Sequence, residues 1–135
     1  MVSSSFRCSK SSIGRENRNL HKITNIKQME TKLYKTKEGV STTYLKYVLA
    51  NKLNEIALIC KLINGVNYEM TITSGNDGIH MKNSKHYKNE AIDIRTRNMN
   101  EQNKVLTQVW IKKWLGINYD VILESNHIHI EYDPK

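Results

Sequence analysis

The stretches AIDIR at residues 91–95 and HIHIEY at residues 127–132 decide the fold. In both, isoleucines alternate with polar or charged residues, and this period of two is that of a β-strand with one buried and one solvent-facing side. The isoleucines are therefore expected to pack on a core. The side chains that share the opposite face are then Ala91, Asp93 and Arg95 from the first strand and His127, His129 and Glu131 from the second.

Apolar residues at helical spacing predict two helices. The first pattern runs over residues 45–63 and is followed by Gly65, a residue that commonly ends a helix in a left-handed conformation. The second pattern runs over residues 105–114 and is followed by Gly116. Both helices are expected to pack on the core. The aromatic side chains expected to be buried there are Trp110 and Trp114.

Two more strands are predicted, over residues 68–74 and near residues 119–124, and GNDG at residues 75–78 is typical of a turn. A chain of 135 residues, 39% of them hydrophobic, has room for one domain with its own core. An antiparallel sheet with helices on one side can leave its other face polar. The sequence therefore predicts a single α+β domain, an antiparallel sheet backed by helices.

Two polar segments supply the donors of a catalytic zinc site: SKHYKNEAID at residues 84–93 and ESNHIH at residues 124–129. His86 and Asp93 offer an imidazole and a carboxylate, and one histidine of the second segment would be the third ligand. A catalytic zinc keeps three protein ligands and leaves a fourth position to water. These residue types therefore point to metal-assisted hydrolysis.

A general base is available beside this predicted site. Glu124 lies a few residues before the last ligand, where its carboxylate could take a proton from the water that the metal acidifies. His86 is expected at the end of a loop that turns at Asn89-Glu90 into the strand of Asp93, so that it reaches the metal from the side. The acids Glu131 and Asp133 are expected to be solvated at a strand end.

These residues resemble a family of zinc peptidases that includes bacterial D-Ala-D-Ala carboxypeptidases and dipeptidases, L-Ala-D-Glu endopeptidases and many phage endolysins. Hedgehog signalling domains share its fold. The family pattern is Ser-x-His, a glycine three residues later, Ala-x-Asp, and then an acidic residue ahead of a His-x-His or Trp-x-His strand. The resemblance covers about residues 40–133. The matching residues here are Ser84, His86, Ala91, Asp93, Glu124, His127 and His129.

The resemblance implies a role for each of these positions. His86, Asp93 and His129 would bind one zinc ion, and Glu124 and His127 would be catalytic. A Glu-x-x-His variant of the pattern also occurs in the family, and it would make His127 the ligand instead. The residues for which we predict substrate contacts are Ser84, His80 and Arg95.

Two positions depart from the family pattern. Asn89 stands in place of the glycine, and asparagine enters the left-handed conformation more readily than other non-glycine residues. Many members also carry an arginine after the upstream Ser-Gly to polarise the substrate carbonyl, where this chain has residues 76–78, NDG. The cations that could substitute for it are Lys82, Lys85 and Arg95.

The resemblance implies a zinc metallopeptidase that hydrolyses amide bonds in peptidoglycan stem peptides, of the endolysin or D,D-carboxypeptidase type. The main alternative is a zinc-stabilised binding domain of the same fold without turnover. A third hypothesis is binding of nucleic acid through the N-terminal segment, which predicts an affinity that disappears with salt.

The basic charge is concentrated at the N-terminus. Residues 1–28 carry six Lys or Arg and one Glu, out of a formal net charge of +8 for the chain. They are predicted to be a disordered tail, and residues 29–135 the peptidase-like domain. A basic tail on a near-neutral domain indicates loose attraction to anionic polymers but no specific nucleic-acid recognition. Neither Cys8 nor Cys60 has a metal-binding spacing, and Cys60 is expected to be buried.

No apolar run that could form a signal peptide or a membrane span is found in residues 1–28. The protein is therefore expected in the cytoplasm of a host cell or associated with a phage, acting on the cell wall. Its expected partner is the peptide of peptidoglycan, and it is expected to be a monomer.

Overall fold

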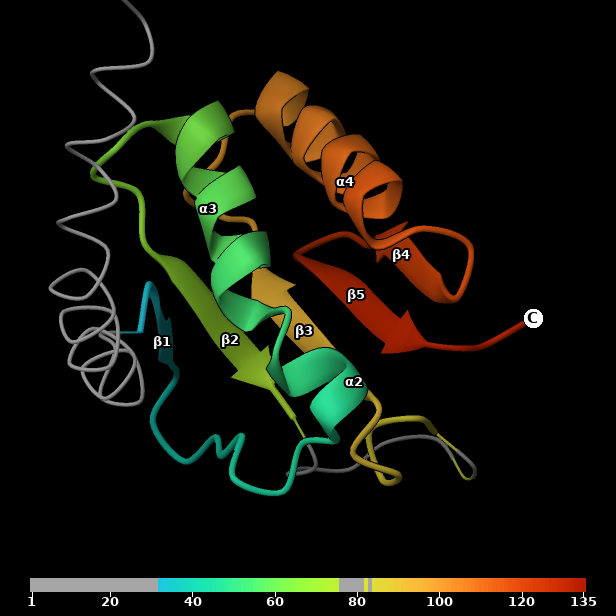
Figure 1. The fold of residues 1–135 in the computed structure, drawn as a ribbon. Helices are drawn as coiled ribbons and strands as arrows, with labels where there is room; N and C mark the ends of the chain where they lie inside the picture. The colour runs from blue at the N-terminus through green and yellow to red at the C-terminus, as the bar shows by residue number, and fades with distance from the viewer. Residues whose placement is uncertain (1–31, 76–81, 83) are drawn as a thin grey trace, which may run out of the picture. The chain divides into compact units, whose positions relative to one another are not determined.

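The computed structural model describes residues 32–75, 82 and 84–135, which form a small α+β domain (Figure 1). The predicted tail over residues 1–28 and most of the predicted turn over residues 75–78 lie outside this part of the chain. The elements, in chain order, are β1 (Tyr34–Thr36), α2 (Tyr47–Ala50), α3 (Leu53–Asn64), β2 (Met70–Ser74), β3 (Ala91–Arg95), α4 (Glu101–Leu115), β4 (Tyr119–Leu123) and β5 (His127–Tyr132).

The strands of this part of the chain form one open sheet in the order β1-β2-β3-β5-β4. The prediction of an antiparallel sheet is wrong at one edge, because β1 pairs with β2 in parallel and the sheet is mixed. Parallel neighbours need a long crossover, and here α2 and α3 provide it between β1 and β2. The strand β1 was not predicted, since three residues are too few to show a period of two.

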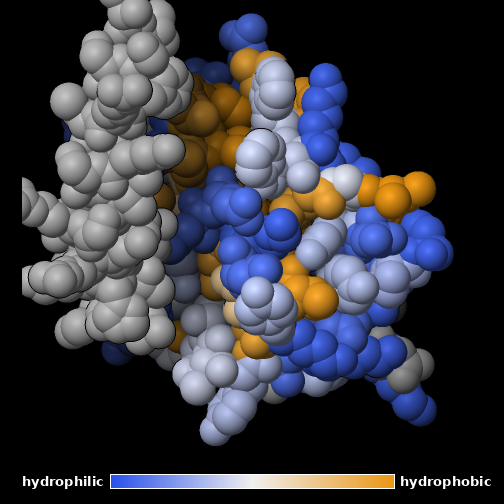
Figure 2. Space-filling model, viewed as in Figure 1, coloured by the Kyte–Doolittle hydropathy of each residue, from blue (hydrophilic) through white to orange (hydrophobic). Residues whose placement is uncertain are grey.

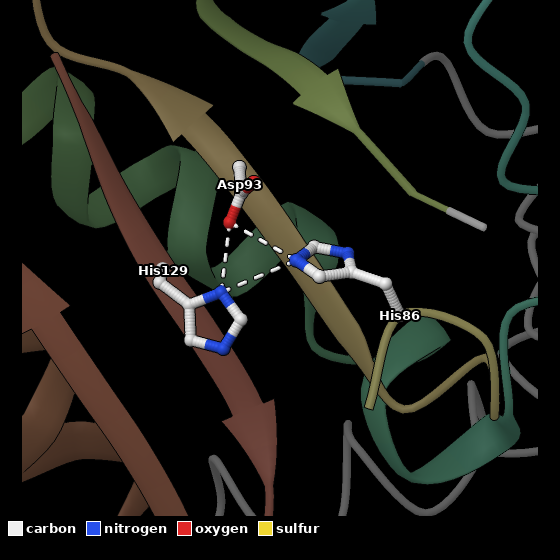
Figure 3. Close-up of side chains that lie close together, drawn as sticks. All are labelled: His86, Asp93 and His129. Atoms are coloured by element: carbon white, nitrogen blue, oxygen red, sulfur yellow. Dashed lines mark hydrogen bonds and ion pairs between the residues drawn. The ribbon is translucent and has the colours of Figure 1, made fainter. Parts of the chain in front are cut away.

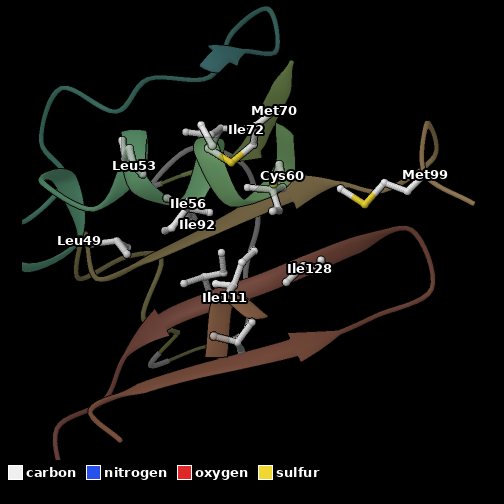
Figure 4. Packing of buried hydrophobic residues seen from close by; sticks show 14 residues of the cluster. Leu49, Leu53, Ile56, Cys60, Met70, Ile72, Ile92, Met99, Ile111 and Ile128 are labelled. Carbon is white, nitrogen blue, oxygen red and sulfur yellow. The ribbon is translucent and has the colours of Figure 1, made fainter. Parts of the chain in front are cut away.

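Alternation in β3 and β5 places their side chains as predicted. Ile92 and Ile94 of β3 and Ile128 and Ile130 of β5 are fully buried, whereas Asp93 and its polar neighbours on β3 and β5 are only partly buried. Figure 4 shows Ile92 and Ile128 among side chains of the helices, and Ile94 and Ile130 belong to the same buried cluster. The residues that the helices contribute to this core include Leu49, Leu53, Ile56, Cys60 and Ile111.

The first predicted helix is divided in two. The helix α2 ends at Ala50 and α3 begins at Leu53. The end of α3 is confirmed at Gly65, whose φ of +113° is a conformation that favours glycine. Cys60 is buried as expected, and burial raises the pKa of its thiol to about 12.

The helix α4 is confirmed, but its tryptophans are not in the core. Trp110 is 52% exposed and Trp114 is 59% exposed, whereas Thr107 and Ile111 are fully buried. The helix therefore turns the stripe that contains Thr107 and Ile111 toward the sheet. Figure 2 shows apolar side chains reaching the surface in the hollow between α3 and α4. The lining residues of this hollow are Glu55, Leu58, Ile59, Leu62, Ile63, Trp110, Lys113 and Trp114.

Candidate metal centre

Three predicted ligands meet on the face of the sheet opposite the helices (Figure 3). Asp93 of β3 and His129 of β5 are directly paired in the antiparallel register, so their side chains lie side by side on one face. His86 comes from the loop before β3 and reaches the same point, where its ring is buried. The strands thus position two of the donors and the loop positions the third.

The donor atoms lie at the separations that a single small ion requires. The Oδ1 atom of Asp93 is 2.8 Å from Nδ1 of His129 and 3.3 Å from Nε2 of His86, and the two nitrogens are 3.2 Å apart. Donors around a tetrahedral zinc with bonds of 2.0–2.1 Å would be about 3.3 Å apart. The two separations that involve His86 match this value and the hydrogen-bonded Asp93–His129 pair is closer, so the three residues form a candidate site for one small metal ion such as zinc.

Both imidazoles are oriented by an acceptor on their outer nitrogen. Nδ1 of His86 lies 2.9 Å from the carbonyl oxygen of Gly75, and Nε2 of His129 lies 3.0 Å from Oε2 of Glu131. These oxygens only accept hydrogen bonds, so the outer nitrogens carry the protons. In the neutral rings, the lone pairs of His86 Nε2 and His129 Nδ1 then point toward Asp93, which is the arrangement found around metal-binding histidines.

The charges of this cluster support one another. Burial alone would raise the pKa of Asp93, but the adjacent rings of His129 and His86 hold it well below its usual range. The hydrogen bond to Asp93 raises the pKa of His129 to about 9, against the effect of burial and with help from Glu131. Without a metal, the Asp93–His129 contact is therefore an ion pair at neutral pH.

The loop that carries His86 is held in place by its own residues. The backbone N–H of His86 donates to Oγ of Ser84 at 3.2 Å, and Asn89 adopts a φ of +60° as expected for the residue at the glycine position. Glu90 accepts from Lys46 at 2.5 Å and from Lys85 at 3.3 Å, and these contacts lower its pKa. The left-handed turn and the two ion pairs together fix the approach of His86 to the sheet.

The predicted catalytic pair lies at the turn of the β4–β5 hairpin, and His127 is the member of the pair that approaches the cluster. Nε2 of His127 is 3.7 Å from Oδ1 of Asp93, and Nδ1 of His127 is 2.6 Å from Oδ1 of Asn126. The backbone N–H of Glu124 donates to the carbonyl of His127 at 2.8 Å, which continues the hairpin and puts the two side chains on one face. The carboxylate of Glu124 is exposed to solvent.

The residues predicted to contact substrate lie in different parts of the chain. Ser84 lies in the loop, where its hydroxyl accepts the bond from His86 described above. Arg95 is two residues after Asp93 on the same face of β3, whereas Lys85 is turned toward Glu90 and Asp133. His80 lies outside the described residues. Of the cations that could replace the missing arginine, Arg95 is the one adjacent to the cluster on the sheet.

Two oxygens that orient the histidines were not predicted. The carbonyl of Gly75 leaves no trace in a side-chain pattern. Glu131 was expected to be solvated, yet it is partly buried and contacts His129. Its position two residues after His129 on the same strand face was a usable signal. Among the described residues, Asp120, Glu131 and Asp133 form a second group of closely spaced carboxylates.

No family model, curated protein or solved structure matches this chain. The site is therefore interpreted from its own geometry. Within the described part of the chain, no helix is both long enough and apolar enough to cross a membrane.

Proposed function

We propose that this protein is a zinc-dependent peptidase that hydrolyses amide bonds in peptidoglycan stem peptides. The observation that carries the proposal is the convergence of His86, Asp93 and His129, whose donor atoms lie close enough together to hold one zinc ion. The family resemblance of the sequence supplies the substrate class.

The proposed chemistry divides between the ion and the protein. A bound zinc ion lowers the pKa of a water molecule and polarises the scissile carbonyl. Glu124 then accepts the proton of the attacking water and returns it to the leaving amine. His127, whose Nδ1 donates to Asn126, stabilises the developing negative charge through its other nitrogen when protonated.

The surroundings of the site support a polymeric substrate. The ligands lie on the open face of the sheet, and the helices cover the other face. A peptide in an extended conformation could therefore lie along β3 and β5 without displacing any helix. Glu124 is exposed at the end of the β4–β5 hairpin, where a water molecule and a substrate can both reach it.

A second candidate function is a zinc-stabilised binding domain without turnover. It is favoured by the way in which the three ligands join the loop before β3 to two strands, because an ion at this point would cross-link these segments whether or not Glu124 acts. This function would need His86, Asp93 and His129 but not Glu124.

One experiment separates the two candidates. Purified peptidoglycan is incubated with the full chain, with the zinc chelated and then restored, and with Glu124→Gln; released amino groups and zinc content are both measured. Glu101→Gln, which alters an exposed glutamate at the start of α4, is the matched control. A peptidase loses at least 100-fold in rate with Glu124→Gln while keeping its zinc. A stoichiometric zinc content without hydrolysis in any form would instead identify the binding domain.

A further inference from the structure

A second, polar hollow of about 430 Å³ lies beside the metal cluster. It begins at His127, whose Nε2 is 3.7 Å from Asp93, and extends across the strands on the same face of the sheet. Its residues come from the segment after β1, from β2, from the end of β3 with the residues that follow it, and from the β4–β5 hairpin. They are Lys37, Thr73, Arg95, Arg97, Asn126 and His127.

The strand register fixes where this hollow lies relative to the metal ligands. Asp93 pairs with His129, and two residues further along the ladder Arg95 pairs with His127. Alternate residues of a strand point to one face and are about 7 Å apart. The side chain of Arg95 therefore projects on the same side as the ligands, about 7 Å along the strand from Asp93.

The hollow collects positive charge without a matching carboxylate. Lys37, Arg95 and Arg97 line it, and among the residues that the structure describes no aspartate or glutamate does. None of these three cations forms an ion pair with another residue in the part of the chain that the structure describes. Lys85 differs, since it is paired with both Glu90 and Asp133 on the far side of the cluster. Like charges that converge on one concave surface attract an anion.

We propose that this hollow is an anion subsite that holds a free carboxylate of the peptide substrate. The inference rests on the proposed peptidase function, because it places the subsite relative to a scissile amide at the zinc. An extended peptide advances about 3.4 Å per residue, so a distance of about 7 Å corresponds to two residues. The preferred substrate is thus a peptide with a carboxylate within two residues of the bond that is cut.

Arginine suits this role better than lysine does. A guanidinium group donates two parallel hydrogen bonds to a carboxylate and remains charged at any pH of interest. With Arg95 and Arg97 two residues apart on one side of the chain, both can address the same anion, and Thr73 and Asn126 add neutral polar groups. The subsite therefore selects charged peptides over their amides.

The test measures binding, so that it does not depend on turnover. The probes are a fluorescent stem peptide with free carboxylates and the same peptide with every carboxylate converted to a carboxamide. Anisotropy is measured with the zinc-loaded full chain carrying Glu124→Gln, and again after adding Arg95→Gln with Arg97→Gln. The charge-matched control adds Lys104→Gln with Lys113→Gln, which removes two cations from α4. Zinc content is checked in every variant.

The free peptide is expected to bind at least 10-fold more tightly than its amide. The two arginine substitutions should abolish this preference without loss of zinc, and the α4 substitutions should leave it intact. Equal binding of the two peptides would overturn the subsite even if peptidoglycan is hydrolysed. A preference that the arginine variant retains, or displacement by inorganic phosphate but not by acetate, would also overturn it. Discrimination without hydrolysis would leave the subsite standing while the peptidase proposal fails.

Discussion

The burial of side chains could be predicted from the sequence better for the strands than for the helix α4. On the strands, a period of two separates core from polar side chains, and the burial patterns of β3 and β5 follow it at every position except Ala91, which is fully buried. On α4, the apolar residues occupy so much of the circumference that the pattern does not specify which stripe is buried. The helix packs through Thr107 and Ile111 and leaves the larger side chains of Trp110 and Trp114 half exposed.

The polar face of the sheet and the helix that covers its other face therefore place different demands on the residue type at each position. A metal site needs donors at fixed separations, so a strand with alternating chemistry leaves few choices. A covering helix needs only enough buried apolar surface, and α4 buries Thr107 at a position that a hydrophobicity pattern would assign to solvent. The predictions below test each side of this contrast.

The largest effect is expected from removal of a metal ligand. His86→Ala, Asp93→Ala and His129→Ala should each empty the site, because two remaining donors rarely retain a catalytic zinc. His127→Ala should keep about one zinc per chain and lower turnover, since its nearer nitrogen is 3.7 Å from Asp93 and it lies outside the closest donor triangle. Zinc content of the purified variants measures this. Loss of zinc only with His127→Ala would make His127 the ligand and His129 an outer residue.

The next largest effect should separate the two sides of α4. Ile111→Ala should lower the free energy of unfolding by about 2–5 kcal/mol, the usual cost of emptying a fully buried site. Trp110→Ala should cost about 1 kcal/mol or less despite removing more atoms, because half of the side chain already contacts solvent. Urea denaturation of the full chain gives both values. A larger cost for Trp110 than for Ile111 would show that the tryptophan face of α4 is covered in solution.

The reach of sequence reasoning can be followed residue by residue. Asp93, His129 and the turn at Asn89 could be placed because each depends on a strand period or a backbone preference that is local. The parallel edge strand β1 could not be predicted from the sequence, since its pairing with β2 depends on a crossover of more than thirty residues. The polar hollow could not be predicted either, because Lys37 and Arg97 lie beside Arg95 only in the folded chain, where four separate segments come together.

A smaller effect is expected at the residue that orients a ligand. Glu131 accepts from Nε2 of His129 at 3.0 Å, and loss of such a contact around metal-binding histidines costs 10–100-fold in affinity. Glu131→Ala should therefore weaken zinc binding by about 10-fold or more. Glu131→Gln retains an acceptor and should lose less. Competition with a chromogenic chelator measures the affinities, and unchanged binding in Glu131→Ala would reduce its role to that of a solvated acid.

The smallest effect is expected from a change of pH. As the pH rises, the folding stability of the metal-free protein should fall while its zinc affinity increases. In the metal-free protein the pKa of His129 is raised from its ordinary value of 6.5 to about 9, because its proton is held by Asp93. The stability that this proton contributes is therefore fully present below pH 6.5 and is lost as the pH rises through 9. Zinc must displace the same proton, so zinc affinity should rise about tenfold per pH unit up to about pH 9.

Two measurements on one preparation check these signs. The melting temperature of the chelator-treated chain should fall between pH 6.5 and 9.5, while the zinc affinity of the same chain rises. In His129→Gln, which has no titrating ring, the fall in melting temperature should be reduced. A zinc affinity that stays flat between pH 7 and 9 would mean that Asp93 does not hold a proton on His129, and the ion pair at the centre of the site would have to be abandoned.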